Sequence, residues 1–147
     1  MSSRLQQKYS QDFYAWALNT AELLRQGKFS DVDIEHVAEE IESMGRSDKR
    51  ELLNRLAILL AHLLKWQFQP ERRGNSWKYT IKTQRFDITE LLSESPSLNR
   101  ELEKQLNHAY EKALLIAINE TGLSQNTFPK KSPFTLNQCL DKQFFPE

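Results

Sequence analysis

The chain has 147 residues, 27% of them charged, and its twenty Lys and Arg balance twenty Asp and Glu. This length suits one domain with one core, while few Gly and Pro and apolar spacings of three and four favour helices over a sandwich or barrel. The longest nearly apolar run, residues 56–64, is too short to span a bilayer, and zero net charge argues against a general nucleic-acid coat protein.

Start and stop signals predict five principal helices, at about residues 12–26, 31–44, 47–69, 77–93 and 98–121. Ser10 or Asp12 can cap the first helix, and Gly27 suits its left-handed end. The second helix follows Ser30 or Asp31 and is expected to stop at Gly45. It carries one apolar stripe at helical spacing, formed by Ile34, Val37, Ala38, Ile41 and Met44.

The third helix, from Ser47 to about Gln69, is predicted to be the core helix. It is apolar on most sides, so other helices must surround it. Its one polar arc consists of Asn54, Arg55, Ile58, His62, Lys65 and Gln69. Pro70 and Pro96 end the third and fourth helices, and Gly122 ends the fifth.

Residues 122–147 hold four of the eight phenylalanines. A disordered tail would be poor in aromatic residues, so this segment is expected to dock on the bundle as an irregular strap. Thr135 and Gln138 have the spacing of a capping box and indicate a short helix near residues 136–140. The predicted fold is therefore all-α: a single-domain helical bundle over residues 1–147, with a Phe/Pro-rich carboxy-terminal strap.

The amino-terminal residues lack the apolar core of a signal peptide, and the single Cys139 cannot form an internal disulfide. We therefore expect a cytoplasmic protein. We also expect no metal and no cofactor. His36, Glu39 and Glu40 lie within one turn, but helix-bundle metal motifs place Glu before His and on two helices.

The segment from Lys65 to Arg85 is the most basic part of the chain, with six basic residues and one acid. On the predicted fourth helix the apolar stripe places three cations on one flank and two aromatic residues facing away from the core. The candidate binding residues are Lys78, Tyr79, Lys82, Arg85 and Phe86, with Arg72 and Arg73 in the preceding loop. Cations beside exposed rings suit single-stranded nucleic acid. Alternatively, the strap or a second subunit covers Tyr79 and Phe86, and the cations pair with acids.

The segment from Asp31 to Glu42 carries six acids and no base. Its simplest interpretation is a solvated helix face, and the alternative is docking onto the basic segment, within the molecule or between molecules. His62 lies on the polar arc of the core helix, and Gln84 falls inside the apolar stripe of the fourth. A structural contact between His62 and Gln84 is the simpler expectation. A catalytic role would require a carboxylate such as Glu40 near His62.

Several motifs resemble, in order, the bacterial family known as domain of unknown function 29, DUF29. The longest is AHLLKWQFQP at residues 61–70, preceded by EEIESMGRS at 39–47. Shorter matches are DFYAW at 12–16, SW at 76–77, SPSL at 95–98 and ETGL at 120–123. The resemblance covers nearly the whole chain and implies an all-helical domain in a bacterial cytoplasm, with no established activity to transfer.

The leading functional hypothesis is a non-enzymatic module that binds a protein partner, or a second copy of itself, through the region from Trp66 to Arg85. Nucleic-acid binding by the same basic and aromatic residues is one alternative. The other is a small metal-independent hydrolase or nuclease-like enzyme centred on His62. No membrane partner is expected.

Overall fold

The computed structural model describes residues 8–147, and these residues contain α-helices, short 3-10 turns and no β-strand. The chain divides into two compact units, Met1–Ser47 and Asp48–Glu147. The helix α3 continues from one unit into the other, so a single domain over the whole chain stays a prediction. The expectation about a signal peptide falls mostly on residues 1–7, outside the described residues.

In the amino-terminal unit, α2 (Phe13–Arg25) begins at the predicted cap, because the Asp12 Oδ1 accepts a hydrogen bond from the Ala15 amide at 3.1 Å. It ends before Gly27, whose φ of 75° is the left-handed conformation that glycine adopts most easily. The Trp16 ring is buried and packs edge to face with the Tyr9 ring, with the two ring centroids 4.8 Å apart.

The prediction of two helices at 31–44 and 47–69 is wrong, because one helix, α3 (Ile34–Phe68), covers both. Gly45 does not adopt the positive φ that would end a helix, and nothing crowds the position where its side chain would be. A glycine inside a helix costs only about 1 kcal/mol relative to alanine, which a long helix tolerates.

The predicted apolar stripe of residues 34–44 is not a buried face in this structure. Ile34, Ile41 and Met44 are all exposed. Helical spacing correctly places these side chains on one face, but spacing alone does not establish that another element covers that face.

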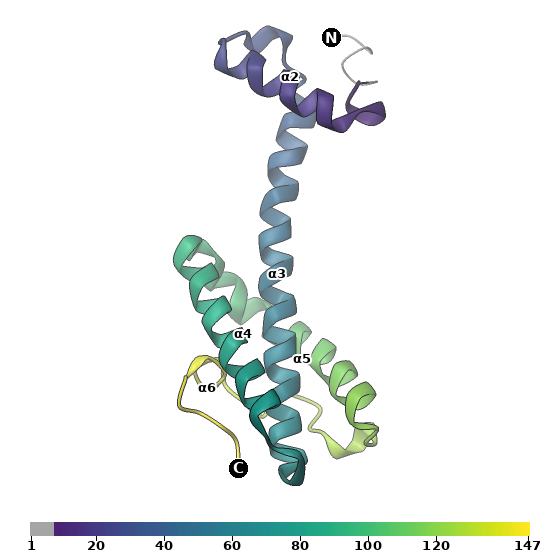
Figure 1. The fold of residues 1–147 in the computed structure, drawn as a ribbon, viewed down its shortest axis with the longest axis vertical. Helices are drawn as coiled ribbons and strands as arrows, with labels where there is room; N and C mark the ends of the chain where they lie inside the picture. Colours follow the sequence, from purple (N-terminus) through teal and green to yellow (C-terminus); the bar gives the residue numbers. More distant parts are fainter. Residues whose placement is uncertain (1–7) are drawn as a thin grey trace. The chain divides into compact units, whose positions relative to one another are not determined.

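The carboxy-terminal unit surrounds the second half of α3. The helices α4 (Asn75–Glu94) and α5 (Asn99–Thr121) run on either side of it, as Figure 1 shows. Its core is mainly aliphatic and includes Leu56, Leu60 and Leu64 of α3, all fully buried. Gly122 ends α5 with a φ of 71°, as predicted. The third predicted helix is therefore the core helix, although it begins much earlier in the chain.

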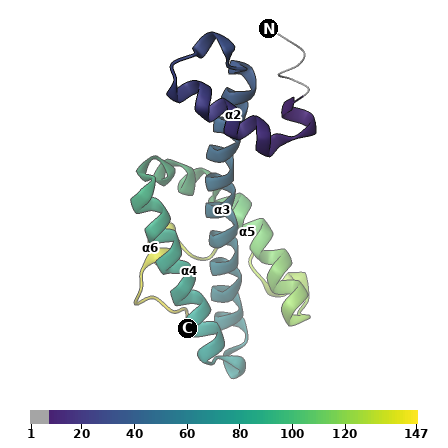
Figure 2. The ribbon, with the colours of Figure 1, turned by 45° about the horizontal axis from the view of Figure 1, so that its top comes forward.

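The carboxy-terminal segment docks on this core, as predicted. Phe128 and Phe134 are buried, and Phe144 and Phe145 pack against the core. The short helix α6 (Leu136–Leu140) contacts both α4 and α5, and Figure 2 shows it beside α4. Thr135 and Gln138 form the expected capping box. The chain thus has an all-α fold with an irregular, phenylalanine-rich strap.

Across the described residues, no helix combines the length and apolar character that a membrane crossing requires.

Candidate functional site

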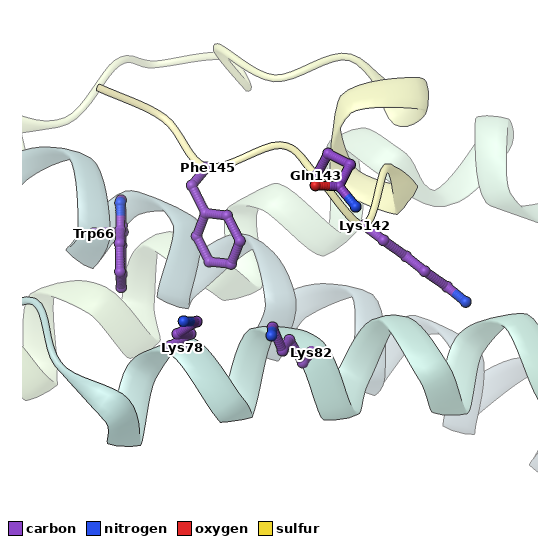
Figure 3. A pocket seen from close by; sticks show the side chains of 6 residues that line it. All are labelled: Trp66, Lys78, Lys82, Lys142, Gln143 and Phe145. Carbon is purple, nitrogen blue, oxygen red and sulfur yellow. The ribbon is translucent and has the colours of Figure 1, made fainter.

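A pocket of about 450 Å³ lies between α4 and the strap in the carboxy-terminal unit. Lys78 and Lys82 stand one helical turn apart on α4 and line its floor, as Figure 3 shows. Phe145 of the strap points toward α4 beside Trp66 of α3, and the two ring centroids are 5.0 Å apart. Lys142 and Gln143 of the strap complete the lining.

A second pocket, of about 330 Å³, adjoins the first, because Lys82, Lys142 and Gln143 line both. Arg85 and Phe86 line only the second. We call the two pockets together the basic groove. It is lined by Trp66, Lys78, Lys82, Arg85, Phe86, Lys142, Gln143 and Phe145.

The groove gathers positive charge and no carboxylate lines it. In the part of the chain that the structure describes, neither Lys78, Lys82 nor Lys142 forms an ion pair. Lys82 lies over the Tyr79 ring, 5.4 Å from its centroid. Three other cations of the carboxy-terminal unit are paired: Lys49 with Glu101, Arg55 with Glu51 and Asp87, and Lys65 with Glu120. The expectation that the basic flank pairs with acids is therefore wrong for Lys78 and Lys82.

Arg85 was predicted to join Lys78 and Lys82 on an exposed flank, but its residue is only 1% exposed. Its Nε donates to the Cys139 carbonyl oxygen at 2.7 Å, and its Nη2 donates to the Gln138 carbonyl oxygen at 3.2 Å. Both carbonyls belong to the short helix α6, so the strap covers Arg85. Burial lowers the pKa of Arg85, although an arginine stays protonated in proteins.

Arg73 holds the strap from the other side. Its Nε donates to the Trp66 carbonyl oxygen at 2.6 Å, and its Nη2 donates to the Glu147 carbonyl oxygen at 3.0 Å. The guanidinium also lies over the Trp66 ring, 5.3 Å from its centroid. Arg73 is therefore a strap contact and does not line the groove. Arg72 is exposed and does not line it either.

The two outward aromatic residues are exposed, as the helical projection predicts. Tyr79 is 56% exposed and Phe86 is 59% exposed. The strap does not cover them, which contradicts one of the two alternatives for these residues. Phe86 borders the smaller pocket, so its ring is an apolar edge of the groove.

Sequence reasoning missed Lys142, Gln143 and Phe145 as groove residues. The strap was expected to dock through its phenylalanines, but its path over α4 depends on tertiary contacts. The only local signal is a lysine and a glutamine directly before two phenylalanines, a pattern that suits a segment with one buried face and one solvent-exposed face.

The predicted contact between His62 and Gln84 is absent. His62 Nδ1 lies 2.9 Å from the Ile58 carbonyl oxygen, which assigns the proton to Nδ1. Gln84 instead accepts a hydrogen bond from Arg55 at 3.4 Å. Burial lowers the pKa of His62.

Glu40, the carboxylate considered as a partner for His62, has its own partner in the amino-terminal unit. Its Oε1 accepts a hydrogen bond from the Tyr9 hydroxyl, which raises the pKa of Tyr9 to about 12. The charged groups that act on His62 are Lys65 and Glu120, and these two pair with each other. Glu40 and His62 therefore each have partners within their own unit.

Two further acids of residues 31–42 have local partners. Asp33 Oδ2 lies 2.6 Å from His36 Nδ1, and Glu42 lies 3.6 Å from Arg46. Among residues 8–147, no group of three or more His, Cys, Asp or Glu side chains is arranged to hold a metal ion. Cys139 is fully buried, and burial raises the pKa of its thiol to about 12, so it is a poor nucleophile.

The family model for domain of unknown function DUF29 matches residues 8–145, nearly the whole chain. No curated protein and no solved structure matches the chain.

Proposed function

Because the chain belongs to the DUF29 family, which specifies no activity, we propose from its geometry that it is a non-enzymatic binding module. Its basic groove binds an acidic segment of a protein partner. The observation that carries this proposal is the group of three unpaired lysines around a concave, partly apolar surface.

Charge supports an anionic partner. Three like charges that share one groove repel one another, and an acidic partner relieves that repulsion while it gains contacts. A cluster of this kind on a chain of zero net charge gives a local preference for anions. It also speeds association with an acidic partner at low ionic strength.

The apolar walls favour a protein over a nucleic acid. Trp66 has Arg73 over its ring and Phe145 beside it, which leaves less of the ring free to stack on a base. Phe86 and Phe145 can instead contact apolar side chains that alternate with acids in a peptide. Nucleic-acid binding through Tyr79 and Phe86 is the alternative that the experiment below separates.

The hydrolase alternative has the weaker support. His62 donates Nδ1–H to its own helix, and the nearby Glu120 is engaged with Lys65. General acid or base chemistry needs a second group within hydrogen-bond reach of the reacting atoms. The proposed setting is the bacterial cytoplasm, in keeping with a single, buried thiol.

Fluorescence anisotropy tests the proposal with a short labelled peptide that alternates Glu with Phe. The matched probes are the same peptide with Gln in place of Glu, and single-stranded oligothymidylate of equal length. We expect the acidic peptide to bind and both matched probes to bind at least ~10-fold more weakly. Preference for oligothymidylate, lost in a Tyr79→Ala, Phe86→Ala variant, would instead establish the nucleic-acid alternative.

The double variant Lys82→Glu, Lys142→Glu should lose peptide binding. The control is Lys130→Glu, Lys131→Glu, because these two lysines are exposed and line neither pocket. Equal binding by both variants would refute the proposal. Self-association is measured by light scattering on the same samples. If the unchanged protein and the control variant are dimers and the groove variant is a monomer, the partner is a second copy of the chain.

A further inference from the structure

Arg85 combines burial with a position at the groove. The residue is 1% exposed, yet it lines the smaller pocket together with Lys82, Phe86 and Lys142. Most buried arginines are neutralised by a carboxylate, because a buried cation without a counter-charge is costly. The surroundings of Arg85 therefore indicate what the pocket is built to accept.

Not all N–H donors of the Arg85 guanidinium have a hydrogen-bond acceptor among the described residues. A guanidinium carries five N–H groups. The Nε and Nη2 atoms donate to the Cys139 and Gln138 carbonyl oxygens. Nη1 is buried and has no hydrogen-bond partner within the described residues.

The positive charge of Arg85 also lacks an anionic partner. No carboxylate in the described chain lies within ion-pairing distance of it. Asp141 is the acid that acts on Arg85 electrostatically, but its Oδ1 accepts a hydrogen bond from the Gln143 amide at 2.9 Å. The face of Phe145 lies 5.5 Å from the guanidinium carbon and gives only partial compensation.

We propose that Nη1 of Arg85 anchors one carboxylate of the bound acidic segment inside the smaller pocket. This inference rests on the proposed function and names its specificity-determining contact. The carboxylate accepts a charge-assisted hydrogen bond from Nη1, while Lys82 and Lys142 add charge at the pocket mouth. A carboxylate fits better than a phosphate, because the arginine offers a single remaining nitrogen and the pocket has apolar walls.

The ligand is therefore an acidic residue next to an apolar one. Phe86 on one edge and Phe145 beside the guanidinium provide contacts for the neighbouring apolar side chain. The surface lysines bind any acidic segment, whereas Arg85 selects a segment that can place one carboxylate inside the smaller pocket.

The test compares Arg85→Gln with Arg73→Gln, using the acidic peptide. Both arginines tie the strap through backbone carbonyls, but only Arg85 lines the groove. We expect Arg85→Gln to weaken binding by about 30-fold or more, the loss expected when one partner of a buried charged pair is removed. Arg73→Gln should weaken binding far less, because it removes a contact to the strap but no donor inside the pocket. Equal losses in the two variants would overturn the anchor, because they would reflect only a loosened strap.

A second measurement does not depend on a variant that folds. Guanidinium N–H signals of Arg85 in the unchanged protein are followed by NMR while the acidic peptide, its Gln counterpart or inorganic phosphate is added. We expect a shift and slowed hydrogen exchange with the acidic peptide alone. Unchanged Arg85 signals at saturating peptide would overturn the anchor and leave the groove proposal standing, whereas absence of peptide binding would remove both. A response to phosphate alone would overturn the choice of a carboxylate.

Discussion

Lys65 belongs to the basic segment of the sequence, but in the structure it is a buried residue with its own counter-charge. Its side chain is 7% exposed and its ammonium pairs with Glu120, which is 44% exposed. The ammonium also lies 5.7 Å from the centroid of the Trp77 ring. The substitution Glu120→Gln should therefore leave a buried cation with only a neutral acceptor and an aromatic face.

The expected loss of stability follows from these exposures. Breaking a fully buried pair costs about 3–5 kcal/mol, but water reaches the Glu120 side, so the loss should approach that of a hydrogen bond to a charged group. We therefore expect about 2 kcal/mol. For a chain of this size that lowers the melting temperature by roughly 4–8 °C, measured by circular dichroism.

Glu103→Gln is the matched control, because Glu103 is an exposed acid on the same helix α5. It should change the free energy of unfolding by less than about 0.5 kcal/mol. The double variant Lys65→Met, Glu120→Gln should recover most of the loss, since the buried charge is then gone. Equal melting temperatures for Glu120→Gln and Glu103→Gln would refute the assignment of Lys65 to the core.

Three further substitutions test local features of the fold. Burial lowers the pKa of His62, so the unfolded chain binds more protons than the folded one as the pH falls below the ordinary value of 6.5, and stability should fall with it. His62→Gln should flatten that dependence in urea titrations, whereas His108→Gln, at an exposed site, should retain it. Gly45→Ala should stabilise the protein by about 0.5–1 kcal/mol, because Gly45 is inside a helix with free space around it. Gly122→Ala should destabilise it by about 1 kcal/mol or more, because that residue has a φ of 71°; stabilisation by both glycine substitutions would contradict the conformations described here.

Much of the fold was predictable where the signal is local. The cap at Asp12, the left-handed end at Gly122 and the capping box at Thr135 and Gln138 all depend on residues within one turn. The prediction that a helix ends at Gly45 also depended on a local signal, and it was wrong. A glycine permits a helix end, but whether the helix stops depends on whether the following turns can continue it.

The groove was only partly predictable. Lys78 and Lys82 were placed together correctly because they are four residues apart on one helix. Arg85 was assigned to the exposed flank because helical projection cannot foresee that the strap crosses its position. Lys142 joins the groove from sixty residues further along the chain than Lys82, through contacts that no local pattern encodes.

The most direct measurement for the groove proposal is the affinity of the acidic peptide for the two charge-reversal variants, at equal protein concentration and ionic strength. Lys130→Glu, Lys131→Glu should bind like the unchanged protein, and Lys82→Glu, Lys142→Glu should bind at least ~10-fold more weakly. If the two variants have the same affinity, the basic groove is not the binding surface.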